Sequence, residues 1–543
     1  MNQRYSPTSS LPGDELADTM TARGYPVVKP ATSADRGVGP YRRLVLRSAR
    51  LLDGTGAPPS GPYDIVIEGG RITEVVLVGV PLKPIDPARR PAQGEREIDC
   101  AGKLVTPGFV DAHVHVGTYY HAPSGPMPDA DYVYKLWLAH GITTVREMAC
   151  MNGVGWTLQQ KQAAARNEID APNIVAHAYF PAVDEFVKTI YTVEQARSWV
   201  RAVKERGVDG LKFFGAPPAI MRAALEEANA LGMRTGCHHA QTAVSSVNAL
   251  RSAGWGLTST EHFYGIPEAM FVDRTLQAYP VGYNFMDESL RYSSSSQNFV
   301  QAAEPGSAKW VETLERFLEL DHSFVPTLAI LEANRDLMRA RRADWHDEYT
   351  HKTLWTYFQP HRGGHCSHWY RWTTSNEVQW KEHFRRWMRF CNDYKNMGGR
   401  VVPGSDAGFT FQLYGFCFIR ELEQMQEAGF HPLEIFKAAT LQSAELLGVE
   451  KETGSIEVGK SADILVHAYD PLDDLKYLYG TGAWRLNDDT GKAEWHRGIQ
   501  YTIKNGVIYD PAELLDDVKK IVADSFGDGD DTRPAARSLE AGA

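Results

Sequence analysis

The chain lacks the sequence features that mark secreted, membrane-spanning and nucleic-acid-binding proteins. Its six cysteines are scattered over 543 residues without C-x-x-C spacing, which favours buried thiols over a disulfide framework. No apolar run reaches the roughly eighteen residues that a membrane span needs. The net charge is -11 and no basic patch is visible, so we expect no nucleic-acid partner. The N-terminus has no basic head followed by an apolar core, and we therefore expect a cytoplasmic protein.

What the chain does have is the composition of a globular protein, and its length suits one large domain with a smaller one. The two flanks differ in texture from the centre. Residues 1–40 are polar and rich in Ser, Pro, Thr and Gly, which predicts a flexible arm, and residues 525–543 are expected to be a disordered tail. Short alternating runs with Gly-Gly turns predict β-structure over 41–103, and the same texture returns over 453–515.

Between these flanks, over residues 104–452, apolar strands alternate with helical patterns. This rhythm predicts an α/β fold in which parallel strands form a barrel. The helical stretches close in Gly, as helix C-caps commonly do. The eight predicted strands cover residues 109–115, 143–149, 173–180, 209–215, 234–240, 257–263, 323–329 and 400–406.

One segment, about 330–398, interrupts the rhythm because it is too long for a single helix. It contains six of the 13 tryptophans. Long insertions at the C-terminal face of a barrel shape access to the site, so we favour a lid over the barrel mouth, with an assembly surface as the alternative. The segment also holds His361, His365, Cys366 and His368, which lack zinc-finger spacing and are expected to serve the lid or substrate contact.

The first predicted barrel strand ends in a pair of histidines, His113 and His115. Residues i and i+2 of a strand face the same way, so both imidazoles project together and suit two nitrogen ligands of one metal ion. The alternative is a strand with two ordinary histidines near a turn. The metal-site interpretation of His113 and His115 depends on whether further candidate ligands lie at the ends of the later strands.

The sequence resembles the amidohydrolase superfamily over roughly residues 42–510. The stretch GFVDAHVH at 108–115 matches its first-strand pattern G-x-x-D-x-H-x-H, and ATLQSAELLG at 439–448 with GSIEVGKSAD at 454–463 matches its closing segment. The resemblance points to the imidazolonepropionase-like and prolidase-like branch, which uses a carboxylated lysine. It implies a (β/α)8 TIM barrel with a small β-sandwich domain built from both flanks, and it departs in the 330–398 insertion and in both tails.

Four further candidates lie at the ends of predicted strands. Lys212 is either a barrel lysine paired with Asp209 or, as the resemblance implies, a CO2-derived carbamate that bridges two ions. In His238-His239 only one ring can face inward, and the family's H-A pattern selects His239. The remaining two are His262, in an E-H pair, and Asp406, which stands among small residues where the family has its catalytic aspartate.

The resemblance therefore implies a binuclear hydrolase with catalytic Asp406 and Lys212. One ion is assigned to His113, His115 and Asp406, the other to His239 and His262, and Lys212 lies between them. Zinc suits the imidazole-rich set, with manganese, cobalt or nickel as substitutes. A hydroxide that bridges the ions would attack the carbonyl carbon, because a bound divalent cation lowers the pKa of water to about 7.

The favoured reaction is cleavage of a C–N amide bond in a small N-acyl amino acid, a dipeptide-like molecule or an amide of an aromatic acid. Ester, lactone or phosphoester hydrolysis on the same site is the first alternative. A mononuclear deaminase is a second alternative, but no carboxylate follows His239 in His239-Ala240-Gln241-Thr242. A homo-oligomer is expected. Candidate substrate contacts are Tyr283, Arg291, Tyr292 and His238.

Overall fold

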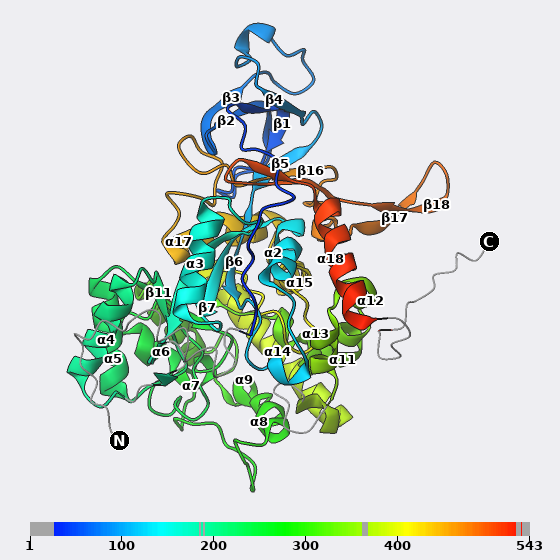
Figure 1. The fold of residues 1–543 in the computed structure, drawn as a ribbon. Helices are drawn as coiled ribbons and strands as arrows, with labels where there is room; N and C mark the ends of the chain where they lie inside the picture. Colours follow the sequence, from blue (N-terminus) through cyan, green and yellow to red (C-terminus); the bar gives the residue numbers. More distant parts are fainter. Residues whose placement is uncertain (1–26, 184–185, 188–189, 361–367, 528–533, 535–543) are drawn as a thin grey trace.

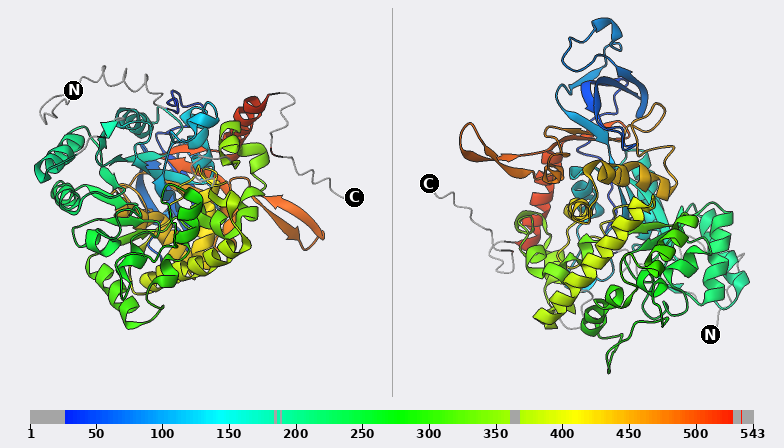
Figure 2. Two further views of the ribbon diagram at one scale, coloured as in Figure 1. Left: turned by 90° about the horizontal axis from the view of Figure 1, so that it is seen from below. Right: turned by 180° about the vertical axis from the view of Figure 1, so that it is seen from behind.

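The computed structural model describes residues 27–183, 186–187, 190–360, 368–527 and 534. A parallel sheet with its helices forms the centre of the molecule, and a second sheet lies at one end (Figure 1). The helices of the 330–398 insertion lie at the opposite end, and the same arrangement is visible from behind in Figure 2. None of the helices among these residues is both long and apolar enough to cross a membrane.

The central sheet is parallel and has eight strands, one at each of the eight predicted places. Its order is β15-β14-β13-β12-β11-β8-β7-β6, so neighbours in sequence are neighbours in space. The strands are β6 (Phe109–Val114), β7 (Ile142–Ala149), β8 (Asn173–Tyr179), β11 (Gly210–Phe213), β12 (Arg234–Cys237), β13 (Ser259–Glu261), β14 (Ser323–Val325) and β15 (Arg400–Val401).

The sheet curls so that its two ends meet. The backbone N–H of Ala112 in β6 donates to the carbonyl of Pro403, 3.1 Å away, and the N–H of Asp406 donates to the carbonyl of His113 at 2.8 Å. Both bonds join the first strand to the segment that directly follows the last. The candidate residues at the strand ends are thereby gathered at one rim.

Helices follow the strands and cover the outside of the central sheet. In chain order the helices are α2 (Ala130–Ala139), α3 (Val154–Ala165), α4 (Val193–Glu205), α5 (Pro218–Ala230), α6 (Ala249–Ala253), α7 (Ile266–Ala269), α8 (Glu288–Ser295), α9 (Asn298–Gln301), α10 (Ala308–Glu319), α11 (Glu332–Arg341), α12 (His346–Tyr349), α13 (Lys352–Phe358), α14 (Thr374–Asn396), α15 (Phe416–Glu427), α16 (Pro432–Lys437), α17 (Ser443–Leu447) and α18 (Pro511–Phe526). Amphipathic sequences account for this cover: Ala196, Trp199, Val200 and Val203 form the buried face of α4.

The second sheet combines both flanks of the chain. Its order is β20-β19-β16-β5-β1-β2-β3, with β4 also paired to β1. The decisive pairing is antiparallel, between β5 and β16, where Val105 lies opposite Val466. The strands are β1 (Leu44–Leu51), β2 (Ser60–Glu68), β3 (Arg71–Leu77), β4 (Arg96–Asp99), β5 (Leu104–Pro107), β16 (Ile464–His467), β19 (Ile499–Lys504) and β20 (Val507–Tyr509).

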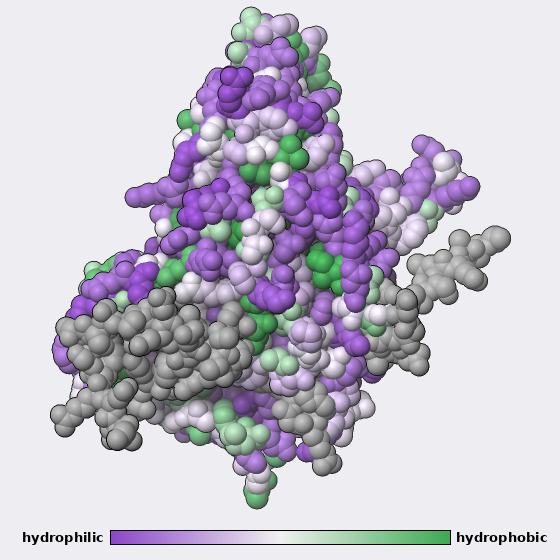
Figure 3. Space-filling view, viewed as in Figure 1, coloured by the Kyte–Doolittle hydropathy of each residue, from purple (hydrophilic) through white to green (hydrophobic). Residues whose placement is uncertain are grey.

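Two short hairpins complete the strand inventory of the described residues. β9 (Ala182–Val183) pairs with β10 (Phe186–Val187), and β17 (Ala483–Asn487) pairs with β18 (Lys492–His496). The second hairpin projects from the body of the molecule (Figures 1 and 2). The face of the molecule drawn in Figure 3 is mainly hydrophilic, with small scattered apolar patches.

The N-terminal segment differs from the flexible arm that its composition predicts. Residues 27–40 are described and pack on the rest of the chain, whereas residues 1–26 lie outside the described part. Val28 is fully buried, and the carboxylate of Asp170 accepts hydrogen bonds from the backbone N–H groups of residues 35–37. Arg36 and Lys135 both pair with Asp517 in α18. A few buried contacts hold this segment in place, although its average composition is polar and predicts a flexible arm.

Burial of neutral histidines predicts a strong pH dependence of stability. Burial lowers the pKa of each of five rings remote from the candidate site, to about 4 for His140, His322 and His346 and to about 3 for His383 and His467. Below about pH 6.5 the unfolded chain binds protons that the folded chain does not, so stability is lost as the pH falls toward 4. Each ring contributes about 1.4 kcal/mol per pH unit in that window.

The measurement is urea unfolding at pH 7.5 and pH 5.5. Three buried carboxyls act in the opposite direction, because burial raises the pKa of Asp111 and of Glu268 to about 7 and that of Glu421 to about 8. Two further buried histidines act with the five named above, because burial lowers the pKa of His239 to about 3 and that of His351 to about 4. The seven histidines outweigh the three carboxyls, so the free energy of unfolding should be about 2–4 kcal/mol lower at pH 5.5. Equal or greater stability at pH 5.5 contradicts this reasoning.

Candidate active site

A cavity of about 510 Å³ opens where the parallel strands end. Its wall includes five of the six residues predicted to form the metal site, all located at or just after the carboxyl ends of strands. This is the face on which barrels of this kind place their sites. These five residues are His113, His115, Lys212, His262 and Asp406.

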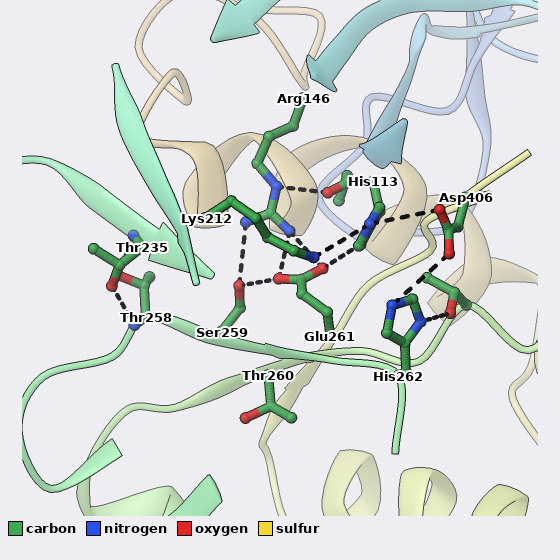
Figure 4. Close-up of polar contacts among 12 residues, drawn as sticks. His113, Arg146, Lys212, Thr235, Thr258, Ser259, Thr260, Glu261, His262 and Asp406 are labelled. Carbon is green, nitrogen blue, oxygen red and sulfur yellow. Dashed lines mark hydrogen bonds and ion pairs between the residues drawn. The ribbon is translucent and has the colours of Figure 1, made fainter. Parts of the chain in front are cut away.

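Two histidines and one carboxylate converge at the centre of this group. Nε2 of His113 lies 3.7 Å from Oδ1 of Asp406 (Figure 4). Nε2 of His115 lies 3.3 Å from the same oxygen. One donor atom from each of the three residues lies within 4.8 Å of the others. Nε2 of His262 approaches Oδ2 of the same carboxylate at 3.8 Å. Asp406 therefore lies between the histidines of β6 and the histidine that follows β13.

The protonation states of this group suit a cation. Burial, followed by the charge of Lys212, holds the pKa of His113 well below its ordinary value, so the ring is neutral and offers a lone pair. Burial alone would raise the pKa of Asp406, but His113 and His115 outweigh it and lower that pKa. A neutral imidazole beside an ionised carboxylate is a donor pair that suits a divalent-metal site.

A buried ion pair orients His113. Its Nδ1 lies 2.6 Å from Oε2 of Glu261, and Glu261 accepts two hydrogen bonds from Nη2 of Arg146 at 2.9 and 3.0 Å. Nη1 of Arg146 also donates to Ser259, while its Nε donates to the carbonyl of Ala112 in β6 (Figure 4). Sequence analysis missed Arg146; the available signal was an arginine inside the apolar strand TTVREMA. The ring of His262 is fixed separately, because its Nδ1 lies 2.6 Å from the hydroxyl of Thr327.

The network predicts strong coupling between Arg146 and Glu261. Arg146→Met or Glu261→Gln each leaves one buried charge unpaired, so we expect each to lower the free energy of unfolding by about 3–5 kcal/mol. The double variant removes both charges and should lose clearly less than the sum of the two. Chemical denaturation of all four proteins measures this coupling, and strict additivity of the two losses would show that the pair does not act as a unit.

Lys212 is buried and lies on the same side as the histidines. Its Nζ is 3.5 Å from Nε2 of His113, and burial lowers its pKa. The alternative partner, Asp209, is engaged elsewhere: its carboxylate pairs with Lys161 at 2.6 Å and accepts the N–H of Ala176. The interpretation of Lys212 as the partner of Asp209 is therefore wrong.

The choice of His239 over His238 is corrected by the strand register. Lys212 in β11 lies opposite Gly236 in β12, and backbone bonds continue this ladder to His238 and Ala240. Since successive side chains alternate, His238 shares the inner side with Lys212, and His239 faces outward. The family's H-A pattern selects His239 because Ala240 follows it directly, but that pattern does not say which side of β12 faces Lys212.

The contacts of the two rings agree with the register. The ring of His238 lies 4.7 Å from that of His262 and lines the cavity. Nε2 of His239 instead lies 2.8 Å from the hydroxyl of Ser252, behind β12. The structure thus brings His238, and not His239, to the group of candidate ligands.

Three of the four predicted substrate contacts line the cavity, and the fourth does not. Arg291 and Tyr292 line the cavity together with His238, whereas Tyr283 is absent from the described lining and stacks on Tyr279 at 4.1 Å. From the insertion, Ile330, Leu331 and His368 reach the cavity wall; His361, His365 and Cys366 lie outside the described residues. Sequence analysis did not find the aromatic residues of the wall, which are Tyr119, Tyr120, Tyr179, Phe214, Tyr264, Phe285 and Phe409.

A family model adds to this geometry. Residues 386–508, from α14 through β15 and into the second sheet, match the model of the amidohydrolase family. This part of the chain, less than a quarter of its length, is similar to the amidohydrolase family. Among curated proteins, the chain is 25% identical to the dihydropyrimidinase of Rattus norvegicus over 249 residues, which cover 44% of this chain and 45% of that protein. It is 36% identical to the imidazolonepropionase of Symbiobacterium thermophilum over 87 residues, which cover 16% of this chain and 20% of that protein.

The aligned parts thus span less than half of these curated relatives. Solved structures match over more of the chain. A prolidase-like protein of Bifidobacterium longum superposes with a TM-score of 0.57 at 22% identity, over 90% of this chain and 100% of that one. At this identity the likeness shows a shared fold, which agrees with the parallel sheet and its helices.

Proposed function

We propose that this protein is a metal-dependent amidohydrolase that cleaves a C–N amide bond in a small molecule. The observation that carries the proposal is the convergence of His113, His115 and Asp406 at the ends of β6 and β15. Lys212 and His262 adjoin the same group. The prolidase-like fold and the match to the amidohydrolase family support an amide as the bond that is cleaved.

We assign two divalent ions to this site. His113, His115 and Asp406 would hold one ion, and His238 and His262 would hold the other, with His238 replacing the His239 of the sequence-based assignment. Lys212 would contribute to the same site as a carbamate, and the lowered pKa of its buried amine favours the neutral form that reacts with CO2. Zinc is the expected metal, with manganese, cobalt or nickel able to substitute. When bound, such ions supply a Lewis acid that polarises the scissile carbonyl and activates water.

Asp406 moves the proton in this proposal. Its lowered pKa keeps the carboxylate ionised at neutral pH, so one oxygen can accept a proton from the attacking water. The same oxygen then donates that proton to the nitrogen of the leaving amine. Its position between the histidines, 3.3 Å from His115 and 3.8 Å from His262, supports transfer across the centre of the site.

Three structural expectations accompany the function. We propose that the parallel sheet is a complete (β/α)8 barrel, supported by the two backbone bonds that join β6 to the segment after β15. We propose that the second sheet folds as a β-sandwich from 41–103 and 453–515. A homo-oligomer is supported by the projecting β17–β18 hairpin, on which the side chains of Trp484 and Trp495 are exposed.

A substrate screen tests the function. N-acyl amino acids, dipeptides and aromatic amides are offered to the metal-loaded enzyme, and the matched esters and lactones are run in parallel. Release of an amine from at least one amide, lost on chelation and restored by zinc, is the expected result. Turnover of esters or lactones alone would support the alternative function of ester or lactone hydrolysis. Absence of amide turnover across the panel rejects the proposal.

A further inference from the structure

The cavity has one cationic side chain besides Lys212. Among its described lining residues, Arg291 and Lys212 are the only lysines or arginines, and Asp406 is the only carboxylate. Lys212 and Asp406 belong to the strand ends. Arg291 comes from α8, a helix in the long connection after β13. The cavity therefore holds a cation that the proposed metal chemistry leaves unused.

Arg291 is held in one orientation. Its guanidinium carbon lies 4.9 Å from the ring centroid of Phe285 and 4.9 Å from that of Tyr292. Nη2 pairs with Glu288 one turn away at 3.0 Å, which occupies one corner of the planar fork. Burial would lower the pKa of Arg291, but Tyr292 and Glu288 outweigh it, so the side chain stays charged. A stacked, ionised guanidinium is the group that binds carboxylates best.

The insertion fixes the helix that carries Arg291. The indole N–H of Trp372 donates to the carbonyl of Ser289 at 3.3 Å, and that of Trp380 donates to the carbonyl of Tyr292 at 3.0 Å. The ring of His368 stacks on Tyr292 with a centroid distance of 4.0 Å. Three residues of the 330–398 insertion thus hold α8 against the cavity.

A second link ties α8 to the candidate ligands. The amide of Gln241, three residues after His238, donates to the hydroxyl of Ser295 at 2.7 Å, and that hydroxyl donates to the carbonyl of Arg291 at 2.8 Å. Gln241 and the backbone of Arg291 are therefore connected through one short chain of hydrogen bonds. The guanidinium is set at a fixed place relative to the end of β12.

The rest of the wall suits a large apolar group. Tyr119, Tyr179, Phe214, Tyr264 and Phe409 face the cavity beside aliphatic side chains of Val154, Ile330 and Leu331. A cavity of about 510 Å³ has the size of a pocket for one small organic molecule. A ring can stack on such a wall at little entropic cost.

We infer that Arg291 binds a free carboxylate of the substrate, and that the substrate is a carboxylate-bearing amide with an aromatic or bulky apolar group. N-acyl amino acids with such a group, and dipeptides with a free C-terminus, belong to this class. The nature of the substrate's scissile bond rests on the proposed amide hydrolysis. The presence of a carboxylate on the substrate is inferred from the cavity wall. A surface pairing of Arg291 with Glu288 alone would not require the guanidinium to line the cavity.

Binding and turnover are measured separately to test this inference. Calorimetry compares N-benzoylglycine with its methyl ester, which lacks the charge. The wild type should bind the acid about 10- to 100-fold more tightly, as expected for a charge-assisted pair. Arg291→Gln should remove that difference, Arg291→Lys should restore part of it, and Glu288→Gln, the matched control, should preserve it. Equal affinity of the wild type for acid and ester would overturn the inference.

Turnover separates this inference from the proposed function. N-acetylphenylalanine and its decarboxylated counterpart N-acetylphenethylamine share one amide bond. The wild type should favour the first in kcat/KM by about 10- to 100-fold, and Arg291→Gln should lower kcat/KM only for the first. If neither is cleaved while the calorimetric preference persists, amide hydrolysis fails for this class and the carboxylate site stands. If both are cleaved equally, the function stands and the role of Arg291 is rejected.

Discussion

Asp406→Asn is expected to lower kcat by about 10^2- to 10^4-fold, the range in which a general acid–base group contributes. The amide keeps the size of the side chain but cannot accept or deliver the proton. Because its Oδ1 remains available near Nε2 of His115, most of the bound metal should be retained. Steady-state kinetics and metal analysis on the same preparation measure both quantities.

The control for this prediction is Asp406→Ala, which also removes the oxygen near the histidines. It should lose metal as well as activity, whereas the Asn variant should lose mainly activity. An Asn variant with two ions per chain and the wild-type kcat would remove Asp406 from the proton transfer. In that case another group would have to protonate the leaving amine.

His238→Asn is expected to reduce kcat/KM far more than His239→Asn, although the two residues are adjacent. His238 lines the cavity beside His262, and its loss removes a nitrogen donor from the second proposed ion. We expect a loss beyond the roughly 10- to 100-fold that follows removal of an outer partner of a metal ligand. His239→Asn should instead lower the free energy of unfolding by about 1–3 kcal/mol, because the buried hydroxyl of Ser252 loses its ring partner.

His238→Asn and His239→Asn serve as matched controls for each other, because both make the same chemical change one residue apart. Kinetics on protein shown by circular dichroism to be folded measures the first effect, and urea unfolding measures the second. A severe loss of activity in His239→Asn with a nearly normal His238→Asn enzyme would return the ligand to His239. The inward direction of β12 assigned from its register with β11 would then be wrong.

The strands and several candidate residues were predictable because they depend on local patterns. Parallel strands gather their carboxyl ends at one edge, so residues such as His113, His262 and Asp406 could be expected near one another from their order alone. The choice between His238 and His239 could not be made in this way. It depends on which side of β12 faces Lys212, and a shift of one residue reverses that side.

The remaining contacts depend on long-range packing. Arg146 is an inward-facing charge whose partner, Glu261, lies more than a hundred residues away in the chain, so no local pattern reveals the pair. Tyr283 and Arg291 come from one polar connection, and only the fold shows that Arg291 faces the cavity while Tyr283 stacks on Tyr279. The ordered contacts of Val28 were hidden in the same way by a polar composition.

Metal analysis by inductively coupled plasma mass spectrometry, run beside amide hydrolysis on one preparation, tests the central claim most directly. The account predicts about two divalent ions per chain in active enzyme, and a joint loss of metal and activity on chelation that zinc reverses. His113→Asn and His262→Asn should each lower the metal content. Full amide hydrolysis by enzyme that contains no metal, or only one ion per chain, would contradict the binuclear site.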